Sequence, residues 1–98
     1  MALMEITVVP LGTSSPSVSR YVTQAVRVLK EEGIKYELTP MGTVIEGEID
    51  KLLNIAKRMH LATFTQDVKR VLTSITIDDR RDKKSTITGK VASVKKKL

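Results

Sequence analysis

The chain has 98 residues, 41% of them hydrophobic, which suits a single globular domain with one modest core. It has no cysteine and one histidine, which excludes a disulfide framework, a thiolate metal site and a multi-histidine metal cluster within one chain. No run approaches the roughly 20 apolar residues that span a bilayer, and the start MALMEITVVPLG lacks the basic region of a signal peptide. We therefore expect a cytoplasmic protein with no metal and no membrane partner.

The first third of the chain predicts a strand followed by a helix. Residues 3–10 (LMEITVVP) alternate in the way of a half-buried strand. The loop at 12–17 (GTSSPS) contains serines that cap helices and a proline suited to a first helical turn. Apolar residues at helical spacing follow from Val18, and Gly33 predicts the end of this helix.

The next segment predicts a β-hairpin. Residues 34–39 (IKYELT) form its first strand, with Tyr36 and Leu38 facing inward. A turn follows at 39–42 (TPMG), because proline fixes φ at the second position of a type I turn and glycine is favoured at the fourth. Residues 43–47 form the second strand of the hairpin.

A helix, a strand and a further helix are expected after the hairpin. The helix runs from about residue 48 to residue 64, and its acidic start and basic later turns suit the helix dipole. Residues 69–79 (KRVLTSITIDD) are rich in β-branched side chains and form a fourth strand. In the tail, apolar residues at helical spacing favour a third amphipathic helix: Ile87, Val91, Val94 and Leu98. Gly89 within it costs about 1 kcal/mol relative to alanine.

This order of elements predicts an α+β fold of the ferredoxin-like βαββαβ class. One antiparallel sheet carries two helices on one face, and a C-terminal helix is added. We divide the chain into a ferredoxin-like domain at 1–84 and a basic C-terminal helix at 85–98, which is part of the same domain or of its oligomer interface. The strand directions place the 10–17 loop, the 39–42 turn and the 64–69 loop at one end of the sheet.

The sheet face without helices carries an unusual mixture of side chains. By alternation it holds Glu5, Thr7, Val9, Lys35, Glu37, Thr39, Ser74 and Thr76, joined by Val44 and Glu46 if Ile45 faces the core. Carboxylates do not suit a core, and the apolar members do not suit a fully solvated face. The mixture predicts a polar interface between subunits that contains a pocket.

Three groups of residues are candidates for chemistry. The 12–17 loop, at a helix start, suits an anion or plain helix capping. Glu5, Glu37 and Glu46 suit a cationic or amino-bearing ligand, or else pair with Lys35 or with an arginine of another subunit. His60 is not counted among these groups. It has no nucleophile at a readable spacing, so we assign it to the core or its boundary.

The third group lies where the fourth strand ends. IDDRRDK (77–83) mixes acids and bases, which favours an interface or salt-bridge network over a cation site. Its members are Asp78, Asp79, Arg80 and Arg81. Residues 80–98 carry eight basic side chains against one acidic, a net charge of +7, while the rest of the chain is near neutral.

The combination of four motifs resembles the thiamine-binding-protein family of YkoF-like, small ferredoxin-like proteins. The motifs are VVPLGTSSPSVSRYV (8–22), YELTPMGTVIEGE (36–48), KRVLTSI (69–75) and IDDRRDK (77–83), and they occur in one order over nearly the whole chain. The resemblance implies a cytoplasmic protein that binds thiamine (vitamin B1) or its hydroxymethylpyrimidine half without catalysis. It also implies homodimers or homotetramers that assemble through the sheets and the C-terminal helix.

The resemblance also implies site residues. The conspicuous polar positions of the family fall on Thr13, Ser14, Thr43, Glu46, Asp78 and Arg80. Thiamine is a cation with an aminopyrimidine ring, so it needs polar partners and an apolar or sulfur-rich wall. These come from Glu46, Thr43, Thr7, Val44 and Met41, and we expect Glu46→Gln to weaken thiamine binding several-fold without unfolding the protein. No other cofactor is implied.

Two other functions stay open at this point. A nucleic-acid-binding module would use the basic tail, but aromatic residues make up only 3% of the chain and Tyr21 and Tyr36 both face inward, so bases have no stacking platform. A small enzyme at a subunit interface would use Glu46 and Asp78 as acid and base, but no nucleophile or metal set supports it.

Overall fold

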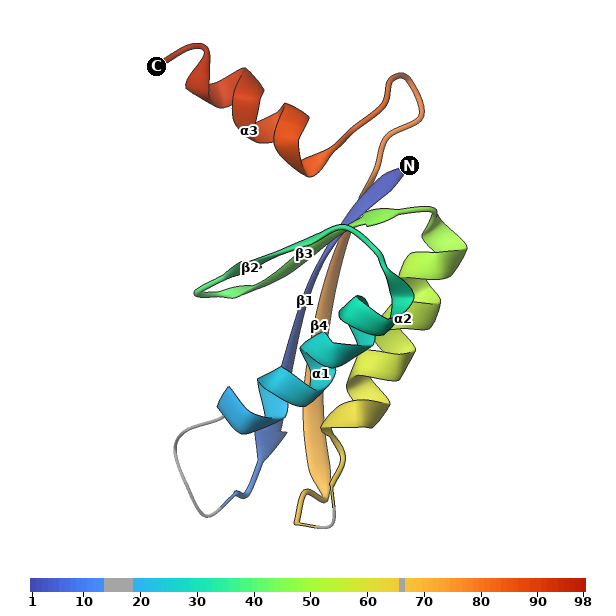
Figure 1. The fold of residues 1–98 in the computed structure, drawn as a ribbon, viewed down its shortest axis with the longest axis vertical. Helices are drawn as coiled ribbons and strands as arrows, with labels where there is room; N and C mark the ends of the chain where they lie inside the picture. The colour runs from blue at the N-terminus through green and yellow to red at the C-terminus, as the bar shows by residue number, and fades with distance from the viewer. Residues whose placement is uncertain (14–18, 66) are drawn as a thin grey trace.

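The elements of the fold follow one another in the order that the sequence predicts (Figure 1). The computed structural model describes residues 1–13, 19–65 and 67–98. Its elements are β1 (Ala2–Leu11), α1 (Ser19–Glu32), β2 (Tyr36–Thr39), β3 (Gly42–Gly47), α2 (Ile49–Thr63), β4 (Arg70–Asp79) and α3 (Ile87–Lys95). The ferredoxin-like α+β fold is therefore confirmed. The serine caps expected for α1 lie outside the described residues.

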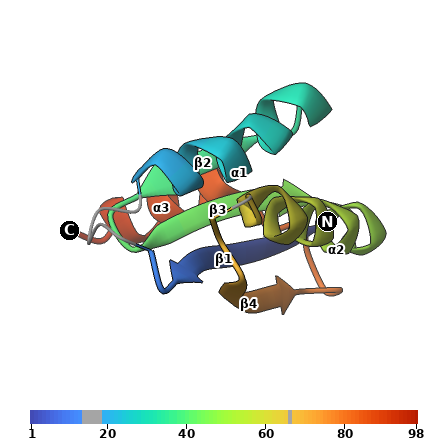
Figure 2. The ribbon, with the colours of Figure 1, turned by 90° about the horizontal axis from the view of Figure 1, so that it is seen from below.

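The four strands form one antiparallel sheet in the order β2-β3-β1-β4. Figure 2 shows β4 as the outermost strand on one side and the β2–β3 hairpin on the other. The core lies between the sheet and the two helices α1 and α2. Its fully buried members include Met4 and Ile6 of β1, Leu29 of α1 and Leu52 and Ile55 of α2. Each such side chain stabilises the fold by about 1.5–3 kcal/mol.

The register assigns side chains to the two faces of the sheet. Ile45 is fully buried against the helices, so Val44 and Glu46 lie on the open face, as the alternation predicts. The same register places Thr43 on the helix face, opposite Ile6. No helix among the described residues is long and apolar enough to cross a membrane.

The hairpin is shorter than the sequence indicates, and this changes one part of the expected arrangement. β2 begins at Tyr36 and has four residues, and β3 pairs with β1 only as far as Thr43 opposite Ile6. The 39–42 turn therefore lies beside the middle of β1 and not at the end of the sheet. Leu38, expected to face inward, is 56% exposed.

α3 leaves the body of the domain instead of packing along it (Figure 1). Ile87 is buried, but Val91 and Val94 of the predicted apolar stripe are 46% and 61% exposed, and the helix ends before Leu98. Gly89 lies at the cap of α3, where its N–H donates to the Thr86 hydroxyl over 2.9 Å. A Cβ at residue 89 would lie only 2.8 Å from that hydroxyl oxygen. The structure thus explains the glycine by the cap that starts α3.

Candidate functional site

An apolar pocket lies between α1 and the β2–β3 hairpin. Its volume is about 240 Å³, and it is lined by residues 6–9 of β1, by residues 38–43 of the hairpin, by the α1 face that carries Val22 and Val26, and by Met59 of α2. We call this space the hairpin pocket. The short hairpin creates it, because α1 extends past the turn and leaves the space between them unfilled.

One wall of the hairpin pocket is a strand edge without a partner. β1 pairs with β4 over its whole length but with β3 only from Ala2 to Ile6. Within the described ranges, the β3 side of β1 therefore has no strand partner from Thr7 onward. Backbone N–H and C=O groups in such a stretch need hydrogen-bond partners, and a bound molecule can supply them.

Two threonines line this part of the pocket. Thr43 is 5% exposed and lines the pocket, and its hydroxyl has no hydrogen-bond partner in the described part of the chain. Thr7 also lines the pocket, at the first unpaired position of β1. Among the described residues no buried side-chain oxygen or nitrogen lacks a hydrogen-bond partner, so the Thr43 hydroxyl keeps some contact with solvent in the pocket and is a candidate ligand contact.

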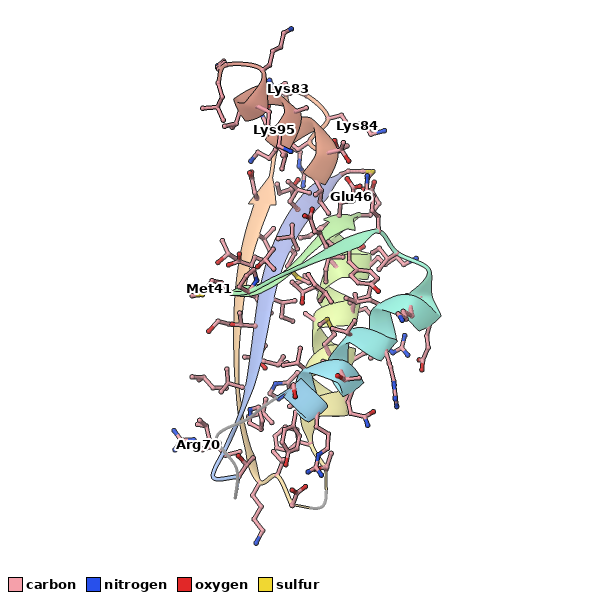
Figure 3. All side chains as sticks on the ribbon, turned by 60° about the vertical axis from the view of Figure 1, so that its left-hand side comes forward. Met41, Glu46, Arg70, Lys83, Lys84 and Lys95 are labelled. Carbon is pink, nitrogen blue, oxygen red and sulfur yellow. The ribbon has the colours of Figure 1, made fainter. Side chains whose placement is uncertain are left out.

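The rim of the pocket is formed by the tip of the hairpin. Met41 is 81% exposed and projects from the turn, away from the body of the domain (Figure 3). The turn is closed by Thr39, whose hydroxyl accepts from the Met41 and Gly42 N–H groups over 3.2 and 3.1 Å and donates to the Gly42 carbonyl over 2.8 Å. The Met41 side chain is therefore presented on a rigid turn.

Glu46 lies at the other end of β3, in a separate region. It is 6% exposed, and one carboxylate oxygen lies 3.3 Å from the Lys35 ammonium while the other accepts from the Ile87 backbone N–H over 3.4 Å. Lys35 also donates to the Thr88 hydroxyl over 2.8 Å. We call Lys35, Glu46, Ile87 and Thr88 the C-terminal anchor, because these contacts attach the start of α3 to the sheet.

A wide charged cleft of about 650 Å³ lies next to the C-terminal anchor, between the N-terminus, the start of α2 and residues 79–84. The acids and bases of IDDRRDK largely pair within it or beside it. Arg80 contacts Asp82 over 2.5 Å, Arg81 contacts Asp79 over 3.2 Å, and Asp78 pairs with Lys90 of α3. The hydrogen bond from Arg80 also lowers the pKa of Asp82.

A small polar cluster ties α1 to the loop before β4. The Tyr21 hydroxyl donates to Asp67 over 2.8 Å, and Arg20 lies 3.2 Å from the same carboxylate oxygen. Hydrogen bonds from the Thr65 and Tyr21 hydroxyls hold the pKa of Asp67 below its ordinary value of 3.8. His60 is half-buried between α2 and β4, with Nδ1 2.6 Å from the Thr73 hydroxyl. His60 thus lies at the core boundary.

Comparison with known proteins adds the family. The model of the family described as "Thiamine-binding protein" matches residues 4–95. The chain belongs to the thiamine-binding protein family. The UPF0045 protein YqgV of Bacillus subtilis is 47% identical over 102 residues, which cover 100% of this chain and 98% of the relative.

Solved structures of the family have the same fold. A hypothetical protein of Methanocaldococcus jannaschii, MJ1052, superposes with a TM-score of 0.88 at 39% identity. The superposition covers 96% of this chain and 95% of the MJ1052 chain. A candidate thiamine biosynthesis and salvage protein of Thermotoga maritima superposes with a TM-score of 0.79 at 26% identity, over 95% and 97% of the two chains.

The site residues expected for this thiamine-binding family member fall into two regions. Met41, Thr43 and Thr7 come together in the hairpin pocket. Val44 and Glu46 lie on the open face, and Glu46 belongs to the C-terminal anchor with Lys35, the partner that the sequence offered as the alternative. Thr13 is half-buried after β1, and Ser14 lies outside the described residues. The prediction that Glu46 contacts a ligand stays a prediction.

Sequence reasoning missed the apolar walls of the hairpin pocket. Val22 and Val26 fit a helix stripe, and Leu38 and Pro40 fit a strand and a turn, so each has an ordinary explanation. The available signal was the pair of large apolar side chains beside the turn, Leu38 and Met41, which a solvated hairpin does not need. Among the described residues, no group of three or more acids or histidines could hold a metal ion.

Proposed function

We propose that this chain binds thiamine, or its hydroxymethylpyrimidine half, in the hairpin pocket, in the cytoplasm and without catalysing a reaction. The observation that carries the proposal is the combination of an apolar pocket, an edge of β1 that has no strand partner among the described residues, and the Thr43 hydroxyl in the pocket lining. Membership of the thiamine-binding protein family supports the choice of ligand.

The pyrimidine ring suits this pocket in both shape and polarity. Ligand pockets usually measure about 300–1,000 Å³, so a space of about 240 Å³ suits one aromatic ring better than the whole of a two-ring molecule. An aminopyrimidine carries a donor beside ring-nitrogen acceptors, and a free strand edge offers N–H and C=O groups in alternation. The apolar side chains of α1 cover the ring faces.

The thiazolium ring of thiamine would then lie at the mouth of the pocket. The described residues of the pocket lining include no carboxylate to balance a positive charge, so the cation is better left partly in water. Met41 stands at this mouth, and its sulfur suits contact with an aromatic ring. The proposal therefore predicts that hydroxymethylpyrimidine keeps much of the affinity of thiamine.

The same lining supports binding over catalysis. Acid–base catalysis needs a titratable group within about 3 Å of the proton that moves. None of the described residues that line the hairpin pocket carries a carboxylate, an imidazole, an amine or a guanidinium. Charged side chains instead form the C-terminal anchor and line the charged cleft.

We propose further that the protein works as a homo-oligomer. Val9 and Leu72 on the open face and Val94 on α3 are exposed apolar side chains, as an interface would need. The rival function, nucleic-acid binding, is favoured by the basic tail, which carries Lys83, Lys84 and Lys95 at one end of the molecule (Figure 3). An RNA titration across salt separates the two, because only the rival predicts a steep salt dependence.

Calorimetry with purified protein tests the proposal. Thiamine and hydroxymethylpyrimidine should bind, and Thr43→Val should weaken both about fivefold, since a hydrogen bond contributes about 1 kcal/mol. Thr23→Val is the matched control, because its hydroxyl bonds to the Ser19 carbonyl on the exposed side of α1. Equal affinities for wild type and Thr43→Val would remove this hydroxyl from the site. Native mass spectrometry of the same samples gives the stoichiometry.

A further inference from the structure

The end of the chain carries its whole excess of positive charge. Residues 83–98 contain six lysines and no aspartate or glutamate, while the chain as a whole has a net charge of +6. These residues form α3 and the segment that leads into it from β4. The acids that could balance the six lysines must therefore come from elsewhere in the protein or from a bound molecule.

A groove of about 470 Å³ lies between α3 and the segment that precedes it. Its described lining contains no carboxylate and five basic side chains: Arg80, Lys83, Lys84, Lys90 and Lys97. We call this space the lysine groove. Figure 3 shows Lys83 and Lys84 beside α3, at the end of the molecule away from Arg70.

Nearby acids offset only part of the charge of the lysine groove. Asp82 pairs with Arg80, and Asp78 pairs with Lys90. The five basic side chains of the groove therefore exceed these two acids by three charges. Like charges held close together repel one another, and an anion bound between them relieves that repulsion.

One face of α3 contributes hydroxyls to the lysine groove together with its lysines. Residues at spacings of four, three and four lie on one side of a helix, and those of α3 and its flanking turns that line the groove have this spacing: Thr86, Lys90, Ser93 and Lys97. The Thr86 hydroxyl accepts from the Gly89 N–H, so its own hydrogen can still be donated to an anion.

Ser85 adds a buried polar side chain to the lysine groove. It is 5% exposed and lines the groove. Among the described residues no buried side-chain oxygen or nitrogen lacks a hydrogen-bond partner, so the Ser85 hydroxyl keeps some contact with solvent in the groove. Because burial already orders this side chain, its hydroxyl can donate to an anion at little cost in conformational entropy.

The neighbouring charged cleft is a poorer place for an anion. It shares Arg80, Lys83 and Lys84 with the lysine groove, but its lining also includes the carboxylates of Glu48 and Asp79. An anion in the charged cleft would meet these two carboxylates, whereas an anion in the lysine groove meets ammonium groups and hydroxyls. The difference in lining favours the groove.

The lysine groove suits a small molecule that carries several negative charges close together. Lysine binds phosphate groups as a point charge, and an excess of three positive charges suits more than one phosphate. A space of about 470 Å³ lies within the usual range for small-molecule pockets. No aromatic side chain among the described lining residues offers a platform on which the bases of a nucleic acid could stack.

We propose that the lysine groove binds the di- or triphosphate group of a small molecule. The bound phosphates join the lysines of residues 83–84 to those of α3, and this holds α3 against the segment that precedes it. The inference does not depend on the ligand of the hairpin pocket, because no described residue lines both spaces. The two sites can therefore be tested separately.

Calorimetry with sodium diphosphate and tripolyphosphate, at about 0.15 M salt, tests the proposal. Each should bind once per chain. Lys84→Met together with Lys97→Met should weaken diphosphate binding more than about tenfold, because both ammonium groups line the groove. Lys95→Met together with Lys96→Met is the matched control, since it removes the same charge from α3 and the turn after it at residues outside the groove lining. The control should keep its affinity within about twofold.

Hydrogen exchange gives a second readout, which a loosely held counter-ion would not change. Saturating diphosphate should slow the exchange of the backbone amides of α3 about tenfold and leave β1 unchanged. Citrate is the comparison probe, because it carries several negative charges but no phosphate. No binding of diphosphate, an equal loss of affinity in the two lysine double variants, or citrate binding as tight as diphosphate would overturn the proposal. A short single-stranded RNA that tripolyphosphate fails to displace would also overturn it, because the groove would then belong to nucleic acid.

Discussion

The hairpin pocket and the C-terminal anchor lie at opposite ends of the same strand and differ in almost every property. About 13 Å of β3 separates Gly42 from Glu46. Among the described residues, the pocket is apolar and includes an edge of β1 without a strand partner and the Thr43 hydroxyl, whereas the anchor contains a buried carboxylate whose two oxygens are both engaged. The difference teaches that charged residues that lie near one another often form ion pairs with each other. A binding site instead contains polar groups that have no partner within the protein.

The most severe test of this comparison is to fill the pocket. Val22 is half-buried on the α1 wall, and Val22→Phe places a ring where the ligand ring would lie. We expect thiamine affinity to fall more than about 100-fold, with little change in melting temperature. Val91→Phe on the exposed side of α3 is the matched control. Undiminished binding by Val22→Phe would place the ligand outside the hairpin pocket.

A milder test removes the charge of the C-terminal anchor. Glu46→Gln loses the charge-assisted contacts to Lys35 and to the Ile87 N–H, so backbone amides of α3 should exchange hydrogen about tenfold faster. Thiamine affinity should stay unchanged. Glu48→Gln is the control, because Glu48 is exposed and lies 3.9 Å from the N-terminal amine. The several-fold loss of affinity that the sequence alone led us to expect would instead show that the two regions act together.

The smallest expected effect concerns pH. The pKa of Asp67 is lower in the folded protein than its ordinary value of 3.8, so its contribution to stability is complete above that pH and is lost as the pH falls through the lower folded value. Asp67→Asn should therefore be less stable than wild type at neutral pH, and the two should converge in acid. Chemical unfolding from pH 7 to pH 3 measures this. In a Tyr21→Phe background, which removes one donor to Asp67, the difference should shrink.

Much of the fold can be predicted because it depends on local patterns. Alternation identified β1, the apolar stripe identified α2, and Gly33, with φ of 64°, ends α1 as expected. The hairpin pocket could not be predicted in this way. It depends on how far β3 pairs along β1, and that distance is set by the length of the hairpin and its position against α1.

The direction of α3 could not be predicted from the sequence either. Its apolar stripe predicts an amphipathic helix that belongs to the domain or to an oligomer interface, and within the helix only Ile87 is buried. The decisive contact joins Glu46 to a backbone N–H forty-one residues later in the chain. No local pattern marks such a pair. Glu46 was correctly singled out as an unusual carboxylate, but its partners emerge only from the register of the sheet.

The single hydroxyl that closes the hairpin has a consequence for how such proteins can diverge. The Thr39 hydroxyl closes the turn by hydrogen bonds to backbone atoms of residues 41 and 42. The side chain at position 41 takes no part in these bonds. A lineage can therefore exchange Met41 for another residue in one mutational step and keep the domain intact. Position 41 stands at the mouth of the pocket, where such a step alters the chemistry that an incoming molecule meets. The hairpin tip is thus a place where new ligand preferences can evolve at little risk to folding.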